Sequence, residues 1–127
     1  MAFLQSLLLV ILAFVLWFAY RYLRLRSAAK ILSSEEFQAM MHGAQVIDIR
    51  EADLFREKHI LGARNIPYSQ LKMSGKALRK DKPVLLYEGD VATRVTPAAT
   101  YLKKQGYKDI YILNGGLARW TGKIKTK

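Results

Sequence analysis

The sequence of 127 residues contains no cysteine. This absence excludes disulfide bonds, zinc-thiolate sites, c-type haem attachment and any thiol nucleophile or persulfide carrier within the chain. No internal repeat or low-complexity tract interrupts the sequence either. Because 51% of the residues are hydrophobic, the length and composition predict one compact domain with an appendage.

Charged side chains are missing from Phe3 to Tyr20, where 12 of the 18 residues are Leu, Ile, Val or Phe. With its flanks the segment reaches about 20 residues, enough for a helix that crosses roughly 30 Å of hydrocarbon. Its apolar side chains favour the bilayer by about 4 to 7 kcal/mol, which exceeds the cost of Gln5 and Ser6. We therefore predict a transmembrane helix with a basic flank over residues 1–26.

Two other interpretations of this segment fit the sequence less well. A cleaved signal peptide would begin with basic residues and end in small ones, whereas no basic residue precedes Phe18 and bulky Tyr20 and Tyr22 follow. A buried core helix would show one polar face, and this segment is apolar all round.

Basic residues gather directly after the apolar segment, at Arg21, Arg24, Arg26 and Lys30. The positive-inside rule places this flank in the cytoplasm. We therefore predict a single-pass cell-membrane protein with its N-terminus outside and its C-terminal domain in the cytoplasm. Trp17, Tyr20 and Tyr22 lie near the same boundary and are suited to anchor the helix at headgroup depth.

The formal net charge of +11 reflects 21 Lys and Arg against 10 Asp and Glu. Without the four flanking bases, 17 basic and 10 acidic residues remain, so the domain itself carries +7. An anionic lipid surface would attract this charge. Nucleic acid is not an expected partner, because the sequence has no aromatic-basic stacking motif or reading helix. The predicted partners are membrane lipid, through the helix, and an unidentified protein.

The remaining sequence alternates between strand and helix patterns. Ser33 and Glu36 form a capping-box pattern that predicts a short helix ending near Met41. Apolar runs at 45–49, 84–87 and 110–113 are typical of buried parallel strands, and residues 96–105 have helical character. This order predicts an α/β domain over residues 31–124, with a small parallel sheet, helices on both faces and right-handed crossovers.

Three stretches of this domain resemble the rhodanese-like family, which is related to the Cdc25-type phosphatases. The first comprises residues 46–51 (VIDIRE), Phe55, His59-Ile60, Gly62-Ala63 and Asn65-Ile66-Pro67. The second comprises Arg94, Ala98-Ala99, Leu102 and Gly106-Tyr107, and the third is Gly115-Gly116-Leu117-Ala118-Arg119-Trp120. The resemblance covers residues 31–123 and departs from the family at Lys58, where a Gly is usual. It implies the rhodanese fold.

Most signature residues are interpreted as structural. Asp48 and Arg50 at a strand end can pair with each other or cap backbone, and Gly115 and Gly116 permit a tight turn before Trp120. His59 is expected to have a hydrogen-bonded packing role. Its only companion is His42, and the two complete no metal-ligand pattern, so neither a metal nor a cofactor is expected.

In active relatives the resemblance implies a Cys at the end of the strand, followed by a loop whose amides and helix N-terminus face one point. That arrangement binds anions and lowers the pKa of the thiol. The corresponding loop here reads Glu88, Gly89, Asp90, Val91, Ala92, Thr93 and Arg94. Two alignments with the family are possible. If the loop is aligned from the end of the strand at Tyr87, Glu88 occupies the Cys position and the loop has one extra residue. If it is aligned from the following helix through Arg94, Gly89 occupies that position. Sulfur is missing in both registers.

Glu88 and Asp90 put negative charge beside a loop that otherwise suits anions, so thiosulfate or phosphate should be repelled. One hypothesis is that a carboxylate folds into its own loop and accepts the amide hydrogen bonds. The alternative is that both acids point into solvent. Catalysis by a carboxylate nucleophile is not expected, because no acid or metal lies nearby in sequence. Arg94 either supports the loop or binds an anion.

These observations predict a non-catalytic rhodanese-like module that binds or regulates another protein at the cytoplasmic membrane face. The degenerate loop from Glu88 to Arg94 is the candidate interaction or anion site. The alternative is a component of a sulfur relay whose thiol is supplied by a partner. A third possibility is a lipid sensor that uses the basic flank and the lysines of the domain.

Overall fold

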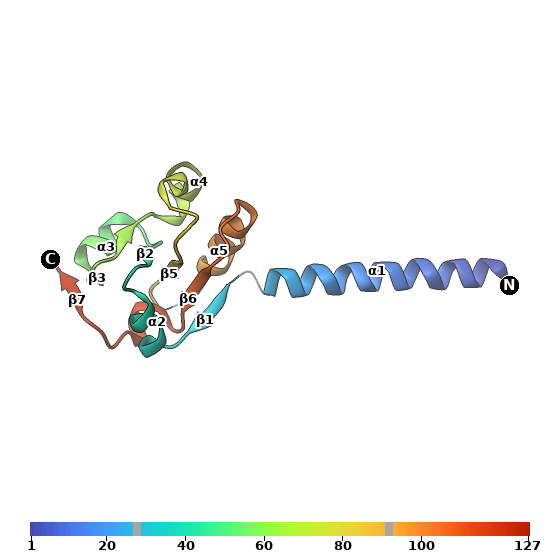
Figure 1. The fold of residues 1–127 in the computed structure, drawn as a ribbon, viewed down its shortest axis with the longest axis horizontal. Coiled ribbons are helices and arrows are strands. Elements are labelled where there is room, and N and C mark those ends of the chain that lie inside the picture. Colours follow the sequence, from blue (N-terminus) through green and yellow to red (C-terminus); the bar gives the residue numbers. More distant parts are fainter. Residues whose placement is uncertain (27–28, 91–92) are drawn as a thin grey trace.

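A computed structural model describes the backbone of residues 1–26, 29–90 and 93–127. The first element is the long helix α1 (Ala2–Arg26), which projects away from the domain (Figure 1). Its residues Ala2–Leu23 have a mean hydropathy of 2.5 and are not buried, so this helix is long and apolar enough to cross a membrane. The predicted fold, an apolar N-terminal helix followed by an α/β domain, is confirmed.

A five-stranded parallel sheet forms the centre of the domain, in the order β1-β6-β5-β2-β4. Its strands are β1 (Lys30–Leu32), β2 (Gln45–Asp48), β4 (Arg64–Asn65), β5 (Val84–Tyr87) and β6 (Ile110–Leu113). A second sheet pairs β3 (Lys58–Ile60) with β7 (Ile124–Thr126) in antiparallel fashion. The chain therefore places β5, the strand before the candidate loop, in the middle of the main sheet.

The helices connect and cover these strands. They are α2 (Ser34–Met40), α3 (Ala52–Glu57), α4 (Leu71–Ser74) and α5 (Val95–Lys104), with short 3-10 turns η1 (Tyr68–Gln70), η2 (Gly75–Ala77) and η3 (Gly116–Arg119). The predicted capping box begins α2, because Ser33 Oγ accepts from the Glu36 amide at 3.2 Å and Glu36 Oε1 accepts from the Ser33 amide at 3.1 Å. This helix ends one residue before the predicted Met41.

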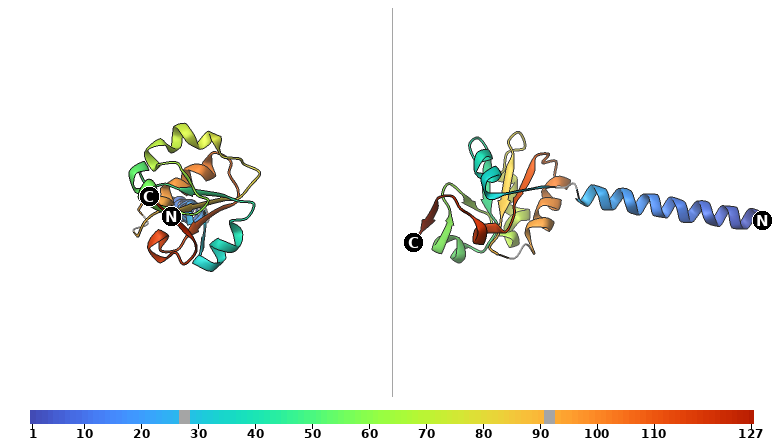
Figure 2. Two further views of the ribbon diagram at one scale, coloured as in Figure 1. Left: turned by 90° about the vertical axis from the view of Figure 1, so that its left-hand side faces the viewer. Right: turned by 90° about the horizontal axis from the view of Figure 1, so that it is seen from below.

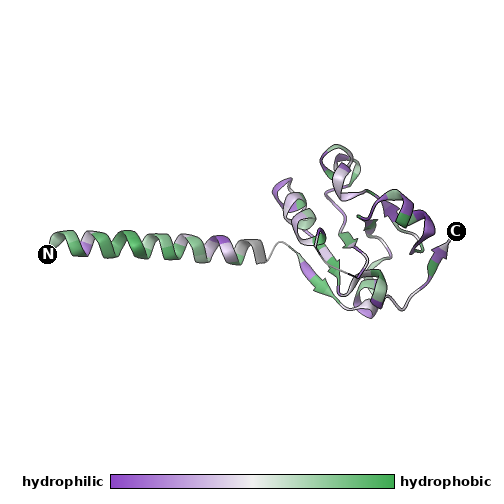
Figure 3. Cartoon of the chain, turned by 180° about the vertical axis from the view of Figure 1, so that it is seen from behind, coloured by the Kyte–Doolittle hydropathy of each residue, from purple (hydrophilic) through white to green (hydrophobic). Residues whose placement is uncertain are grey.

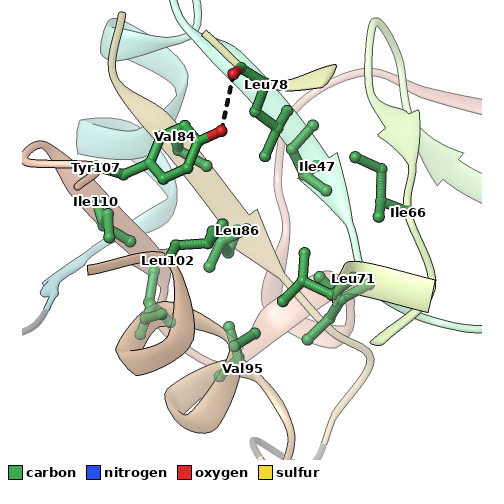
Figure 4. Packing of buried hydrophobic residues seen from close by; sticks show 14 residues of the cluster. Ile47, Ile66, Leu71, Leu78, Val84, Leu86, Val95, Leu102, Tyr107 and Ile110 are labelled. Carbon is green, nitrogen blue, oxygen red and sulfur yellow. Dashed lines mark hydrogen bonds between the residues drawn. The ribbon is translucent and has the colours of Figure 1, made fainter. Parts of the chain in front are cut away.

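Alternate side chains of the central strands enter two separate cores, as the period of two in a strand requires. On one face Ile47, Leu86 and Ile112 pack against the buried side of α5, together with Leu71 of α4 (Figure 4). On the other face, residues of β2 and β5 pack against α2 and η3 in a cluster that contains Val46, Leu85, Tyr87, Phe37 and Leu117. The sheet is thus covered on both faces.

Because all five strands run parallel, their ends define two opposite edges of the sheet. We call the edge where the strands end, after Asp48, Tyr87 and Leu113, the carboxyl edge. The amino edge is where the strands begin, at Lys30, Gln45, Val84 and Ile110, and it is the edge that the chain enters from α1. The C-terminus and the second sheet lie at the other end of the domain (Figure 2).

Candidate functional site

The candidate loop lies at the carboxyl edge, between the end of β5 and the start of α5. Ligands of parallel α/β sheets bind at this edge, so the loop occupies the position where a functional site is expected. Asp90, Thr93 and Arg94 are exposed, whereas Glu88 is only 9% exposed. The predicted loop residues Val91 and Ala92 lie outside the described residues.

The side chain of Glu88 turns back into its own loop. Its Oε1 atom accepts hydrogen bonds from the backbone amides of Arg94 at 2.7 Å and Val95 at 2.6 Å. These amides belong to the first turn of α5, where the helix dipole is positive and amides have no partner within the helix. The hypothesis of a carboxylate that accepts the loop amides is therefore confirmed for Glu88, and the alternative that both acids point into solvent is wrong.

The turn at Gly115 and Gly116 closes the site from the other side. The amide of Leu117 donates to the carbonyl of Glu88 at 2.8 Å, which holds the turn against the loop. Gly116 has a φ of +60°, and a Cβ there would overlap the carbonyl oxygen of Gly89. Between loop and turn remains a hollow of about 10 Å³, which is room for one water at most. Thiosulfate or phosphate does not fit into it.

Asp48 and Arg50 form an ion pair beneath the loop, as one of the two sequence interpretations predicted. The fully buried Asp48 carboxylate accepts from Arg50 Nη2 at 2.7 Å, from Nε at 3.0 Å and from the Arg50 amide at 2.9 Å. Burial acts to lower the pKa of Arg50, but the hydrogen bonds and charge of Asp48 raise that pKa above its usual value. Arg50 Nη2 also donates to the carbonyl of Lys58. The pair thus joins β2 to β3.

Two further residues support this corner, and the sequence interpretation did not assign them a role. The hydroxyl of Tyr87 accepts from the Ile60 amide at 3.1 Å. Burial, together with the nearby charge of Asp48, raises the pKa of Tyr87. Asn65 Nδ2 donates to the carbonyls of Asp48 at 3.0 Å and Arg50 at 2.8 Å. The only sequence signal for the role of Tyr87 was its position, because a polar aromatic residue ends an otherwise aliphatic strand.

The remaining signature residues have packing roles. His59 Nδ1 donates to the carbonyl of Phe55 at 2.6 Å, and the two rings stack with centroids 3.8 Å apart. Trp120 meets Phe37 edge to face at 5.8 Å and donates from Nε1 to the Lys123 carbonyl at 3.2 Å. Within the described residues no group of three or more His, Cys, Asp or Glu side chains could hold a metal ion.

The guanidinium of Arg94 lies at the surface of the loop. Its Nη1 atom is 3.8 Å from Oε1 of Glu51, and both side chains are about half exposed. Glu51 also accepts a hydrogen bond from Ser69 Oγ at 3.2 Å. An exposed pair at this distance contributes about 0 to 1 kcal/mol to folding. The backbone amide of Arg94 supports the loop through Glu88, while its guanidinium is about half exposed to solvent.

Comparison with known proteins agrees with this geometry. Residues 33–123 match the rhodanese-like domain family. The uncharacterized protein YqhL of Bacillus subtilis is 45% identical over 120 residues, which cover 94% of each chain. The thiosulfate sulfurtransferase GlpE of Pseudomonas fluorescens is 34% identical over 97 residues, which cover 74% of this chain and 86% of the relative.

Solved structures show the same fold. A rhodanese-related protein from Thermoplasma volcanium superposes with a TM-score of 0.70 at 22% identity, covering 77% of this chain and 99% of that protein. The family match covers most of the chain, and the paired Asp48 and Arg50, the loop after β5 and the Gly115-Gly116 turn lie within it. This chain therefore belongs to the rhodanese-like domain family.

Proposed function

We propose that this protein is a membrane-anchored rhodanese-like domain that has no sulfurtransferase activity of its own and binds another protein through its altered loop. The observation that carries the proposal is the Glu88 carboxylate, which accepts the two amides of Arg94 and Val95. In an active site of this design those amides would stabilise a bound anion or thiolate. Here a side chain of the protein itself holds them.

The chain also lacks the chemical group that sulfur transfer requires. With no cysteine in 127 residues, it has no thiol to carry a persulfide. The hollow that the described residues form beside Glu88 measures about 10 Å³, which is too small for a sulfur donor. Glu88 holds the end of the loop that leads into α5, and Asp90, Thr93 and Arg94 are exposed in the described part of the loop, where a partner can reach them.

Anchoring is supported by α1. Its apolar surface from Ala2 to Leu23 is not buried by the domain and requires an apolar environment (Figure 3). The basic residues Arg21, Arg24 and Arg26 follow on one side only, so the domain faces the cytoplasm by the positive-inside rule. Tethering confines the domain to the membrane plane and raises its effective concentration towards membrane-bound partners.

A sulfur relay in which a partner supplies the thiol is the second candidate. It is favoured by the similarity to GlpE, whose name describes a thiosulfate sulfurtransferase. In this case the domain would contribute binding surface to a reaction completed by another protein. It would place the chain in sulfur metabolism without any sulfur-bearing residue.

The first test measures thiocyanate formation from thiosulfate and cyanide by the purified full chain in detergent. We expect no activity above the uncatalysed reaction, and turnover by the wild-type chain would overturn the proposal. Membranes that lose this activity when the gene is deleted, while the purified chain has none, would favour the sulfur relay.

The second test places a photo-crosslinking amino acid at Asp90 or Thr93 in native membranes, with Lys72 of α4 as the matched exposed control. We expect one defined crosslinked protein from the loop positions only, and its loss on Arg94→Ala. Equal crosslinking from Lys72 would contradict a role of the loop as the binding surface.

A further inference from the structure

We propose that the amino edge of the sheet binds anionic phospholipid headgroups of the leaflet into which α1 leads. This inference rests on the membrane anchoring proposed above and goes beyond it, because it assigns a second, lipid-binding surface to the domain itself. The surface lies at the opposite edge of the sheet from the Glu88 loop.

Exposed basic side chains surround this edge, and they come from several separate segments of the chain. They are Lys30 at the start of β1, Arg79, Lys80 and Lys82 before β5, Lys103 and Lys104 at the end of α5, and Lys108 before β6. The acidic residues among them are Asp81 and Asp109. Arg79 Nε pairs with Asp81 at 2.9 Å, so Asp81 neutralises the charge of Arg79 and not that of the lysines. The lysines leave a net positive surface.

Backbone and side-chain contacts hold these segments together at one edge. Gln45 Nε2 donates to the Arg79 carbonyl at 2.8 Å, and the Arg79 amide donates to Gln45 Oε1 at 2.7 Å. Lys103 Nζ donates to the carbonyl of Lys108 at 3.2 Å. The Nζ atom of Lys80 lies 5.7 Å from the centre of the Tyr107 ring. The basic residues therefore form one surface.

A pocket of about 260 Å³ opens within this surface. Its polar lining includes Lys76, Lys80, Tyr101 and Gln105. The hydroxyl of Tyr107 donates to the carbonyls of Gly75 and Leu78, which fixes its ring as a wall of the pocket (Figure 4). The volume is close to the lower end for small-molecule sites, about 300 Å³, and two ammonium groups suit a phosphate. This pocket therefore suits one phospholipid headgroup.

The short connection to α1 brings this edge close to the membrane. Lys30, the first residue of β1, comes four residues after Arg26, the last residue of α1. Four residues span about 14 Å at full extension, so the start of β1 lies within that distance of the helix end in any linker conformation. The surface potential of an anionic leaflet decays over a Debye length of about 8 to 10 Å. At full extension the start of β1 lies just beyond this range, and every linker conformation shorter than about 8 Å brings the lysines next to β1 within it.

The absence of cysteine makes a direct test possible. The full chain with Ala77→Cys, an exposed position beside the pocket, carries a single spin label. It is reconstituted into nanodiscs of phosphatidylcholine, either alone or with about 30% phosphatidylglycerol to represent a charged leaflet. The measured quantity is the accessibility of the label to oxygen relative to a water-soluble nickel complex. We expect this ratio to rise about fivefold in the anionic discs and to return to the neutral value at high salt.

Two charge-reversal variants of equal net charge separate this surface from charge in general. Lys80→Glu, Lys104→Glu and Lys108→Glu change the amino edge and its pocket, whereas Lys58→Glu, Lys123→Glu and Lys125→Glu change the second sheet and the residue before β7, at the other end of the domain. We expect only the first set to abolish the rise. Loss of the rise in both sets, or a label ratio independent of lipid charge, would overturn the proposal. A chain that fails to enter discs at all would instead refute the anchoring.

Discussion

A single side chain, that of Glu88, occupies the amides with which the loop of an active relative would bind an anion. Two registers of the loop are compatible with the sequence, because residues 88 and 89 both fit the position at which active relatives carry Cys. In the structure Glu88 follows the last paired residue of β5 and reaches the first amides of α5. Its role could be predicted as a hypothesis, since a carboxylate and free amides attract each other. Which of the two acids would do so depended on distances that the sequence does not contain.

The first prediction concerns this carboxylate. Glu88→Ala leaves the amides of Arg94 and Val95 without a partner in a buried site, so we expect it to lower the free energy of unfolding by about 2 kcal/mol. Glu88→Gln keeps an acceptor oxygen, so it should lower the free energy of unfolding by about half as much as Glu88→Ala. Denaturant titration of the full chain in detergent measures both, with the exposed Asp90→Ala as control within about 0.5 kcal/mol. Equal values for Glu88→Ala and Asp90→Ala would show that the hydrogen bonds are unimportant.

The second prediction concerns Tyr87 and alkaline pH. Burial raises its pKa above the value of about 10 expected in the unfolded chain, so the folded state favours the neutral phenol. The resulting stability is complete below pH 10 and falls above it, by up to about 1.4 kcal/mol per pH unit. At pH 8 the Tyr87→Phe variant should be less stable than the wild type, because it loses the hydrogen bond from the Ile60 amide. Between pH 10 and 11, however, its free energy of unfolding should fall by less than that of the wild type, because it has no phenol to ionise. The exposed Tyr68→Phe should keep the wild-type slope in denaturant titrations.

At the scale of elements, sequence patterns predicted the parts with strong periodicity or capping. The strands β5 and β6 have the predicted bounds, and α5 is shifted by only one residue from the predicted range. The strands β1, β3 and β7 were not predicted. Each has only three residues, and β3 and β7 pair across more than sixty positions of the chain. Such short strands are stabilised by pairing with a distant strand, and three residues contain too little hydrophobic periodicity to predict a strand from the local sequence.

The third prediction concerns the contact between the Gly115-Gly116 turn and the loop. Gly116→Ala adds a Cβ that would overlap the Gly89 carbonyl, at a residue with positive φ. We expect it to lower the free energy of unfolding by about 2 to 4 kcal/mol, from crowding and backbone strain together. Gly43→Ala is the matched control, because Gly43 also has positive φ but has open space around its Cβ position. It should cost about 1 kcal/mol in the same titration, and a similar cost for both variants would contradict the close approach.

At the scale of the whole molecule, α1 and the domain are independent structures. Every α1 side chain up to Leu23 is exposed, so helix and domain share no core. Residue composition was sufficient to predict this separation. The arrangement of the basic residues on one edge of the domain was not predictable, because it depends on the order of the strands.

The fourth prediction follows from this independence. Leu9→Arg with Leu12→Arg places two charges at the centre of α1 and costs about 6 kcal/mol of insertion free energy, which offsets nearly all of the helix's preference for lipid. We expect the protein to leave the carbonate-resistant membrane fraction. Leu9→Ala with Leu12→Ala should remain in it. The unfolding free energy of the domain should be the same in both, and a change with the arginines alone would show that α1 supports the fold.

The pairing of β1 with β6 also constrains how the molecule is made. Lys30 aligns with Tyr111, so β1 finds its partner only after the 80 residues between them have been synthesised. Until then β1 lacks its neighbour, since among the described strands it lies at the edge of the sheet and pairs with β6. Contacts between such distant segments form late in folding. The nascent domain therefore stays incompletely folded, behind its apolar helix, until β6 has left the ribosome.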